Sequence, residues 1–315
     1  MVIIVYKKNN LHTKLFNIFL FVLATLCFFK LFFEEDNLKG KNVFNLSEEN
    51  IVINEDLNND NKKDSIFIKK SNSDLLAQVN LNSNETYSLN YDKNLQTLGE
   101  YCTYWPVRVS TLDISRDNSK EIFIQSSFHN KAVQHIFSWN GNGYDDIFCS
   151  TNNLLGFIDS ANSRTPKIIS GNFQDNNINL KGYLYNQGSL KEFNNNLTTS
   201  LPGKDTITNF ICLIESLPDP YLSVPNYFYS QISGSDLESI FRLANGSNYY
   251  KFQDGYFTDL AWDNTGNITC ENWILNFRVI STSDSKKVSN LTINLMINKY
   301  NDNDFPFKIT SVNIY

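Results

Sequence analysis

Two loops in the first half of the chain carry oxygen-bearing side chains at alternate positions, a pattern that suits a hard cation. In the first loop the first, third, fifth and ninth places are Asp56, Asn58, Asp60 and Asp64, and the seventh, Lys62, adds its backbone carbonyl. Calcium takes roughly six to eight oxygen ligands at about 2.3–2.6 Å, and short side chains on one loop supply most of them. The sequence therefore predicts a calcium site in this loop.

The same frame recurs in a second loop, with acids and small polar residues at the same places. These residues are Asp113, Ser115, Asp117, Ser119 and Glu121. The sixth place, where the loop turns sharply, is Asn61 in the first loop and Asn118 in the second, and Asn tolerates left-handed backbone well. A third segment, residues 172–177, repeats the frame but has Leu180 where the closing acid belongs. We therefore expect one or two calcium ions rather than three.

An apolar residue fills the second place of each copy (Leu57, Ile114 and Phe173), and an apolar strand is expected beyond each loop. In these features residues 46–200 resemble repeats of the FG-GAP/VCBS type, whose loop has the form D-x-(D or N)-x-D-G-x-x-D ahead of an apolar strand. The resemblance implies propeller-blade sheets with calcium in their loops, in surface and adhesive proteins. The chain departs from the family pattern where Asn replaces the loop glycine. An EF-hand is disfavoured, because its twelfth place needs a Glu and here is apolar.

Short apolar runs separated by Asn, Ser and Asp clusters predict about four strands in each of the first two units. The expected strands of these units are residues 51–53, 66–68, 75–79 and 87–91, and residues 107–112, 122–125, 132–139 and 144–148. The third unit is shorter, with strands expected at residues 167–169, 181–185 and 189–193. A closed propeller needs at least four blades, so three units predict an open stack of sheets whose last edge is covered by the C-terminal part.

A boundary near Gly203 is expected to divide a calcium-loop β-repeat domain (residues 46–204) from an α+β domain (residues 205–315). Residues 226–244 are typical of one or two helices, with Ser235 as the N-cap and an acid three residues later completing a capping box. Long strands are expected to follow, at residues 250–252, 256–262, 273–282, 288–300 and 307–314. In the order of its elements, this part resembles NTF2-like and cystatin-like folds.

An apolar run from Leu15 to Phe33 is long enough to cross about 30 Å of hydrocarbon as a helix, which predicts a transmembrane anchor. Lysines precede it in a stub of residues 1–14 and acids follow it in a linker of residues 34–45, so we expect the stub in the cytoplasm and the bulk of the chain outside a bacterial cell. A cleaved signal peptide and a lipoprotein modified at Cys27 are the alternatives. The net charge of −6, with acids and bases intermixed, argues against a nucleic-acid partner.

The remaining titratable residues match no catalytic motif. Phosphate-loop, dinucleotide, nucleophile-elbow and H-E-x-x-H patterns do not occur in the sequence. His12 lies in the stub, and the spacing of His129 and His135 fits no usual zinc pair, so we expect both at the surface of one hairpin. Four aspartates of the C-terminal half are expected to be solvated loop acids rather than a hydrolytic pair: Asp219, Asp236, Asp254 and Asp259.

Four cysteines lie outside the predicted anchor, and two interpretations stay open. An oxidising compartment permits disulfides with three possible connectivities, and in one of them Cys102–Cys149 would clip the second repeat and Cys212–Cys270 would tie the start of the C-terminal domain to its meander. The alternative is buried, unpaired thiols. A second open question concerns four aromatic residues, which form either a platform for a sugar or packing between sheets: Tyr101, Tyr104, Trp105 and Trp139.

Together these patterns predict a mainly β protein with an N-terminal transmembrane helix, three propeller-blade-like β-repeats and an α+β domain ending in an antiparallel meander. The leading functional hypothesis is a membrane-anchored extracellular binding or adhesion protein without catalysis, whose calcium ions stiffen its loops and whose ligand is a protein or a glycan. The alternative is an envelope accessory or regulatory protein that binds a partner through its C-terminal domain. An extracellular hydrolase is the third hypothesis.

Overall fold

The computed structural model describes residues 44–46, 50–92, 94–159, 165–193 and 201–315. This part of the chain is mainly β, with three sheets, two helices and no closed barrel. Neither of the helices described here is long and apolar enough to span a membrane. The predicted anchor at residues 15–33 lies outside the described residues, together with the stub and most of the linker.

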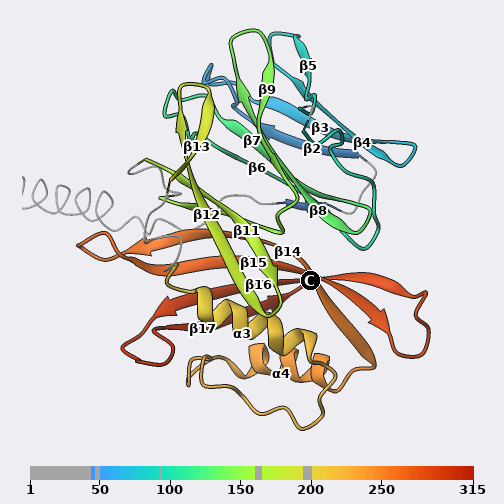
Figure 1. Cartoon of the computed structure of the whole chain (residues 1–315), viewed down its shortest axis with the longest axis vertical. Coiled ribbons are helices and arrows are strands. Elements are labelled where there is room, and N and C mark those ends of the chain that lie inside the picture. Colours follow the sequence, from blue (N-terminus) through green and yellow to red (C-terminus); the bar gives the residue numbers. More distant parts are fainter. Residues whose placement is uncertain (1–43, 47–49, 93, 160–164, 194–200) are drawn as a thin grey trace, which may run out of the picture. The chain divides into compact units, whose positions relative to one another are not determined.

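The first two sheets contain antiparallel meanders, in which each strand pairs with the next along the chain (Figure 1). The first sheet comprises β2 (Asn50–Glu55), β3 (Asp64–Ser71), β4 (Asp74–Asn80) and β5 (Thr86–Ser88). The second comprises β6 (Val107–Leu112), β7 (Glu121–Phe128), β8 (Lys131–Trp139) and β9 (Tyr144–Ser150), with β1 (Phe44–Leu46) added beside β6. The strands predicted for the first two units are thus confirmed in number and place.

The third sheet has eight strands and crosses the predicted domain boundary. Its two meanders are β10 (Leu154–Ile158), β11 (Lys167–Gln174), β12 (Asn177–Asn186) and β13 (Ser189–Phe193), and then β14 (Asn248–Trp262), β15 (Ile268–Ser281), β16 (Val288–Lys299) and β17 (Phe307–Ile314). β10 and β14 pair in parallel, with Leu154 opposite Gly255 and Phe157 opposite Thr258. The predicted border at residue 204 therefore does not separate two sheets, and the edge that the C-terminal part covers is β10.

The second sheet is covered on both faces, and burial along β7 shows how. Ile122 and Ile124 belong to a hydrophobic core shared with the first sheet, which contributes Ile66. Phe123, on the opposite face of the pleat, belongs to a core shared with the third sheet. Its ring meets that of Phe157 edge to face, with 4.6 Å between the centroids. Because both faces of β7 are buried, the strand carries apolar residues at successive positions rather than alternating with polar ones.

The two helices pack against the C-terminal strands, and Phe210 of the first shares a core with Trp273 of β15 (Figure 1). They are α3 (Lys204–Glu215) and α4 (Gly234–Ala244). The N-cap of α4 is Ser233, whose hydroxyl accepts the backbone N–H of Asp236 at 3.1 Å. The predicted N-cap, Ser235, lies inside the first turn, because Ser233 and Asp236 form the capping pair two residues earlier.

Replacing Gly171 with Ala tests the close pairing of β11 and β12. An added Cβ would overlap the backbone carbonyl oxygen of Asn179, which cannot move without disturbing the strand pair. We expect Gly171→Ala to lower the free energy of unfolding by about 2 kcal/mol, the usual cost of overpacking. Gly234→Ala is the matched control, because nothing lies within 4 Å of its added Cβ. Urea unfolding compares the two variants, and equal midpoints would contradict this pairing.

Candidate functional site

The two predicted cation loops lie at the same place in their sheets. The first joins β2 to β3 and the second joins β6 to β7, so each connects the first two strands of a meander. The closing acid of each loop, Asp64 or Glu121, is the first residue of the strand that follows. Similar residues at equivalent positions allow the two loops to be compared bond by bond.

The carboxylate that opens each loop accepts a hydrogen bond from the backbone of the loop's sixth residue. The N–H of Asn61 donates to Asp56 Oδ2 at 2.9 Å, and the N–H of Asn118 donates to Asp113 Oδ2 at 3.1 Å. Both Asn residues have left-handed backbone, with φ of 62° and 72°. The left-handed turn predicted from Asn at the sixth place is confirmed.

The fifth place repeats this agreement. The N–H of Lys62 donates to Asp60 Oδ1, and the N–H of Ser119 donates to Asp117 Oδ1, both at 2.8 Å. In each loop the aspartate therefore binds the backbone two residues ahead, which is an Asx-turn. The predicted seventh-place residues, Lys62 and Ser119, thus take part through their N–H groups, whereas the prediction gave them a role through the backbone carbonyl or the side chain.

The first and third places of each loop lie close together. In the first loop, Asp56 Oδ1 and Asn58 Oδ1 both accept the N–H of Asp60, at 3.2 and 3.1 Å. In the second loop, the hydroxyl of Ser115 donates directly to Asp113 Oδ1 at 3.2 Å. Two of the predicted oxygen ligands thus meet in each loop.

The closing acids are buried, with 1% of each residue exposed, and they bind the second residue of their loops. The N–H of Leu57 donates to Asp64 Oδ2 at 2.9 Å, and that of Ile114 donates to Glu121 Oε2 at 2.8 Å. Leu57 and Ile114 are themselves core residues, as predicted for an apolar second place. Burial raises the pKa of the Glu121 carboxyl, against the opposing effect of these hydrogen bonds.

The loops offer the hard oxygen donors that calcium prefers. A carboxylate oxygen that accepts one N–H keeps a second lone pair for a cation. Within the described part of the chain, no three His, Cys, Asp or Glu side chains gather into a group that could hold a metal ion. The donor set therefore fits calcium in kind, while the loops hold their shape through their own backbone bonds.

The third segment, residues 172–177, does not occupy the equivalent place. It ends β11, turns at Asp175 and Asn176, and begins β12, so it joins the second and third strands of its meander. The equivalent connection runs from β10 to β11 and begins at Asp159. The prediction of a third cation loop is therefore wrong, because the segment lies one connection later in its meander than the other two loops. Asn and Asp favour positive φ both in hairpin turns and in cation loops, so the sequence pattern did not distinguish the two.

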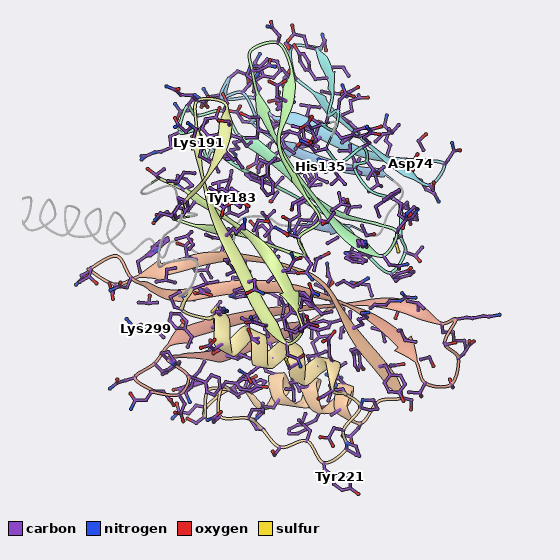
Figure 2. The ribbon with its side chains drawn as sticks, in the orientation of Figure 1. Asp74, His135, Tyr183, Lys191, Tyr221 and Lys299 are labelled. Atoms are coloured by element: carbon purple, nitrogen blue, oxygen red, sulfur yellow. The ribbon has the colours of Figure 1, made fainter. Side chains whose placement is uncertain are left out.

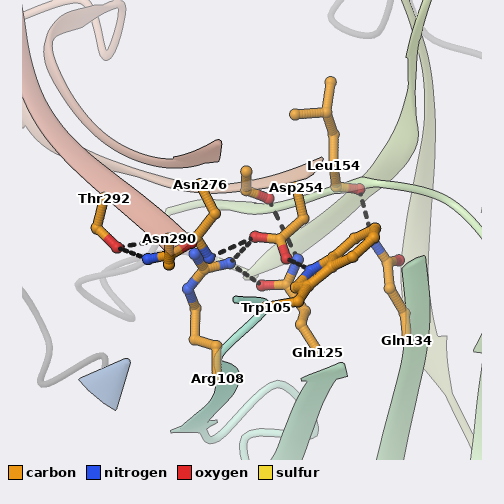
Figure 3. A network of polar contacts seen from close by, with 10 residues as sticks. Trp105, Arg108, Gln125, Gln134, Leu154, Asp254, Asn276, Asn290 and Thr292 are labelled. Carbon is orange, nitrogen blue, oxygen red and sulfur yellow. Dashed lines mark hydrogen bonds and ion pairs between the residues drawn. The ribbon is translucent and has the colours of Figure 1, made fainter. Parts of the chain in front are cut away.

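A buried network of polar side chains joins the second sheet to the C-terminal strands (Figure 3). On β6, Arg108 places Nη1 2.9 Å from Asp254 Oδ1 of β14 and 3.0 Å from Gln125 Oε1 of β7. Asp254 also accepts the side-chain amide of Asn276 at 3.0 Å and the indole N–H of Trp105. The Arg108 and Asp254 side chains are only 1% and 2% exposed, so this is an interior ion pair.

A second pair of buried acids lies further along β14. Asp259 stands opposite Glu271 of β15, and each residue is 1% exposed. Asp259 accepts the indole N–H of Trp262 at 2.8 Å, and Glu271 accepts that of Trp273 at 2.8 Å. Burial raises the pKa of Glu271 to about 7, and the charge of Asp259 adds to the rise. Glu271 is therefore about half protonated at pH 7, whereas an ordinary Glu is ionised there.

The four predicted loop acids have different positions in the structure. The prediction is wrong for Asp254 and Asp259, because both are buried within β14 and bound by indole N–H groups. Asp236 is in the first turn of α4, where its carboxylate accepts the N–H of Val312 at 2.8 Å. Asp219 lies in the connection between the two helices, as expected.

The two described histidines differ in burial. His135, predicted at the surface, is 0% exposed; its Nδ1 lies 2.7 Å from Asp146 Oδ2 and its Nε2 lies 2.8 Å from the carbonyl oxygen of Thr97. Figure 2 labels it among the strands of the second sheet. His129 is exposed in the turn between β7 and β8, as predicted. His135 lies inside an apolar strand that is buried on both faces, which explains the error.

None of the four cysteines in the described residues forms a disulfide, so the pairings Cys102–Cys149 and Cys212–Cys270 are wrong. All four are free thiols, and the alternative of a buried thiol fits Cys270 alone, because the other three are partly exposed. Of the four aromatic residues, Trp139 of β8 packs between the first two sheets, with its ring 4.9 Å from that of Tyr87 of β5. Trp105 is a buried part of the polar network.

A scan against protein-family models, a search of the curated proteins and a search of the solved structures each found no match to this chain. The fold and site define a mainly β protein with two sheets that carry equivalent acidic loops, of which the second packs between the first and an eight-stranded sheet. The resemblance to FG-GAP/VCBS repeats stays a prediction.

Replacing Asp254 with Asn tests how far Arg108 depends on its partner. Asn keeps the shape of the side chain but removes the charge that neutralises the buried guanidinium. Loss of one member of a buried pair costs roughly 3–5 kcal/mol, so we expect the free energy of unfolding to fall by about 3 kcal/mol. Glu192→Gln is the control, because it breaks an exposed pair with Lys181 and should cost less than about 1 kcal/mol. Similar losses in urea unfolding would contradict the interior role of Asp254.

Stability should fall as the pH rises through the range in which Glu271 ionises. An unfolded Glu loses its proton near pH 4.3, whereas the folded group holds its proton until about pH 7. Stability is therefore greatest near the lower value, falls by about 3 kcal/mol up to pH 7, and is level above it. Glu271→Gln should flatten this slope, and Glu238→Gln, on the exposed side of α4, should keep it. Urea unfolding from pH 5 to 8 measures both, and an unchanged slope in Glu271→Gln would refute the assignment.

Proposed function

We propose that this protein is a non-catalytic binding protein of the cell surface, built on β-repeats whose loops take calcium. The observation that carries the proposal is the hydrogen-bond frame shared by the loops Asp56–Asp64 and Asp113–Glu121. In both loops the acids at the first, fifth and ninth places accept N–H groups from the sixth, seventh and second places. A common requirement for a ligand accounts for two loops of different sequence that keep the same frame.

Calcium in these loops would act on stability rather than on chemistry. Asp56 and Asp60 are at most partly buried and carry carboxylates on one short loop, so a cation between them would relieve their repulsion. A cation that binds only the folded loop stabilises the fold by mass action. One ion in each loop would stiffen the connection between the first two strands of each meander.

The same proposal anchors the body to the outer face of a bacterial membrane through residues 15–33. Its support is the apolar run in the sequence, with lysines on one side and acids on the other. Anchorage would hold the binding surface close to the cell, where avidity between several copies compensates for weak single contacts.

A second candidate function, partner binding through the C-terminal part, is favoured by apolar side chains on the connection between α3 and α4. Tyr221 is 92% exposed and Val224 is 46% exposed, and Figure 2 shows Tyr221 projecting at this connection. An exposed aromatic beside another exposed apolar residue suits a protein contact. We propose no hydrolysis at the pair Asp259 and Glu271, because burial keeps both acids from solvent.

Calcium should raise the melting temperature of the full chain, and a chelator should reverse the rise. Calcium at about 100 times its Kd would add about 2.7 kcal/mol to the stability of a single site. The double variant Asp56→Asn, Asp113→Asn removes the opening carboxylate of each loop and should lose most of the rise. Asp145→Asn, an exposed acid on β9, is the control and should keep it. Calorimetric titration counts the ions, and a melting temperature insensitive to calcium would contradict the proposal.

A further inference from the structure

A cleft of about 480 Å³ opens where the second sheet, the turn between β11 and β12, and the start of β14 meet. Its lining includes Trp105, Asn130 and Phe173, and on β14 it includes Gln253. The volume lies in the range of about 300–1,000 Å³ that is usual for sites that hold small ligands. The cleft lining contains no residue of the loops Asp56–Asp64 and Asp113–Glu121, whereas it includes residues 172–175 of the third segment.

Among the residues of the cleft lining, Gln253 has a side-chain amide without hydrogen-bond partners. Phe252 pairs with Phe277 and Asp254 pairs with Asn276, so Gln253 is the extra residue of a β-bulge and has no partner on β15. It is 4% exposed, and neither its side-chain oxygen nor its side-chain nitrogen has a hydrogen-bond partner. A buried amide with no partner is costly, and bulges commonly redirect a side chain beside a functional site.

The other lining residues indicate which kind of ligand would complete this amide. Asn130 accepts hydrogen bonds from Tyr104 and Arg278 at its side-chain oxygen, which leaves its N–H groups as donors. The indole N–H of Trp105 is taken by Asp254, so Trp105 offers the cleft its ring rather than its donor. Amide donors and acceptors beside aromatic surface suit a ligand with hydroxyl groups on a compact, partly apolar ring.

Charge in the cleft is balanced, which favours a neutral ligand. Two lysines and two acids contribute to the lining: Lys131, Lys251, Asp175 and Glu215. The carboxylate of Glu215 accepts the backbone N–H of Phe252 at 2.8 Å. Glu215 therefore occupies a backbone N–H on the edge of β14, just before the pairing with β10 begins at Gly255. A peptide that added to this edge as a strand could not use that N–H, so the cleft does not favour a peptide ligand.

We propose that this cleft binds a neutral saccharide, with neighbouring hydroxyl groups of one sugar unit paired to the amide of Gln253. The inference deepens the proposed binding function and rests on it. The sugar hydroxyls accept from the Gln253 N–H groups and donate to its oxygen, and Asn130 supplies a further donor. Trp105 and Asp254 are held by the interior network, so their positions are fixed before the ligand arrives. The side-chain N and O of Gln253 are enclosed, so its amide turns toward the cleft when the sugar binds.

The test uses the full chain against an immobilised set of neutral oligosaccharides built from hexose and N-acetylhexosamine units. Saturation-transfer NMR then measures the Kd of the saccharide that binds best, which we expect at about 1 mM or tighter. Gln253→Leu keeps the size of the side chain and removes the amide, so affinity should fall about tenfold or more. Gln231→Leu, exposed in the connection between the helices, is the control and should bind as the wild type does.

Urea unfolding of Gln253→Leu separates a binding role from a structural one. If the amide serves a ligand, this variant is at least as stable as the wild type, because a buried unpaired polar group has been removed. A variant that is less stable and a wild type that binds no saccharide would together assign the amide to a structural water and overturn the proposal. Unchanged affinity in Gln253→Leu, or binding of extended peptides in place of saccharides, would also overturn it.

Melting with calcium, measured on the same samples, distinguishes failure of this inference from failure of the proposed function. A calcium-dependent rise without saccharide binding leaves the calcium-stabilised repeats standing and removes only the ligand assigned to the cleft. Saccharide binding that depends on Gln253 without any effect of calcium supports the cleft and contradicts the calcium loops.

Discussion

The ion pair between Arg108 and Asp254 is the constraint on which the packing of the sheets depends. Both charges are buried away from water, which costs several kcal/mol for each. Their mutual attraction and hydrogen bonds offset this cost only when the partner residues are correctly placed. Gln125 and Asn276 complete the pair from the two strands on either side (Figure 3). Apolar contact alone would tolerate many arrangements of one sheet on another, whereas a misplaced sheet would leave these two charges unpaired. The pair therefore selects a single arrangement more than it adds net stability.

β14 brings several of these requirements together within one strand. It pairs in parallel with β10 and antiparallel with β15, so it joins the third meander to the C-terminal one. A strand with neighbours on both sides has few places for an irregular residue. The bulge at Gln253 falls before the parallel pairing begins, and there one edge of β14 is open to the cleft. The bulge also shifts the register of β14 by one residue, and with this register Asp254 faces Arg108.

Much of the local structure could be predicted from the sequence, because local rules determine it. The strands of the first two units followed from apolar runs and turn residues, and the left-handed backbone at Asn61 and Asn118 followed from residue type. The parallel pairing of β10 with β14 joins residues about a hundred positions apart, and no local pattern specifies it. The third loop was misplaced because Asp175 and Asn176 suit a hairpin turn equally well.

The burial of the acids was the feature hardest to predict from the sequence. The tryptophans provide the one sequence signal that indicates it. Three of the four tryptophans donate the indole N–H to a buried carboxylate: Trp105 to Asp254, Trp262 to Asp259 and Trp273 to Glu271. The indole is a donor only, and its large apolar ring excludes water around the carboxylate that it binds. In two of these cases the pair lies two or three residues apart on one strand, so an acid close to a Trp in a long apolar strand is evidence for burial. Such spacing would have placed Asp259 and Glu271 in the interior, but it could not reveal Asp254, whose Trp105 lies 149 residues earlier in the chain, just before β6.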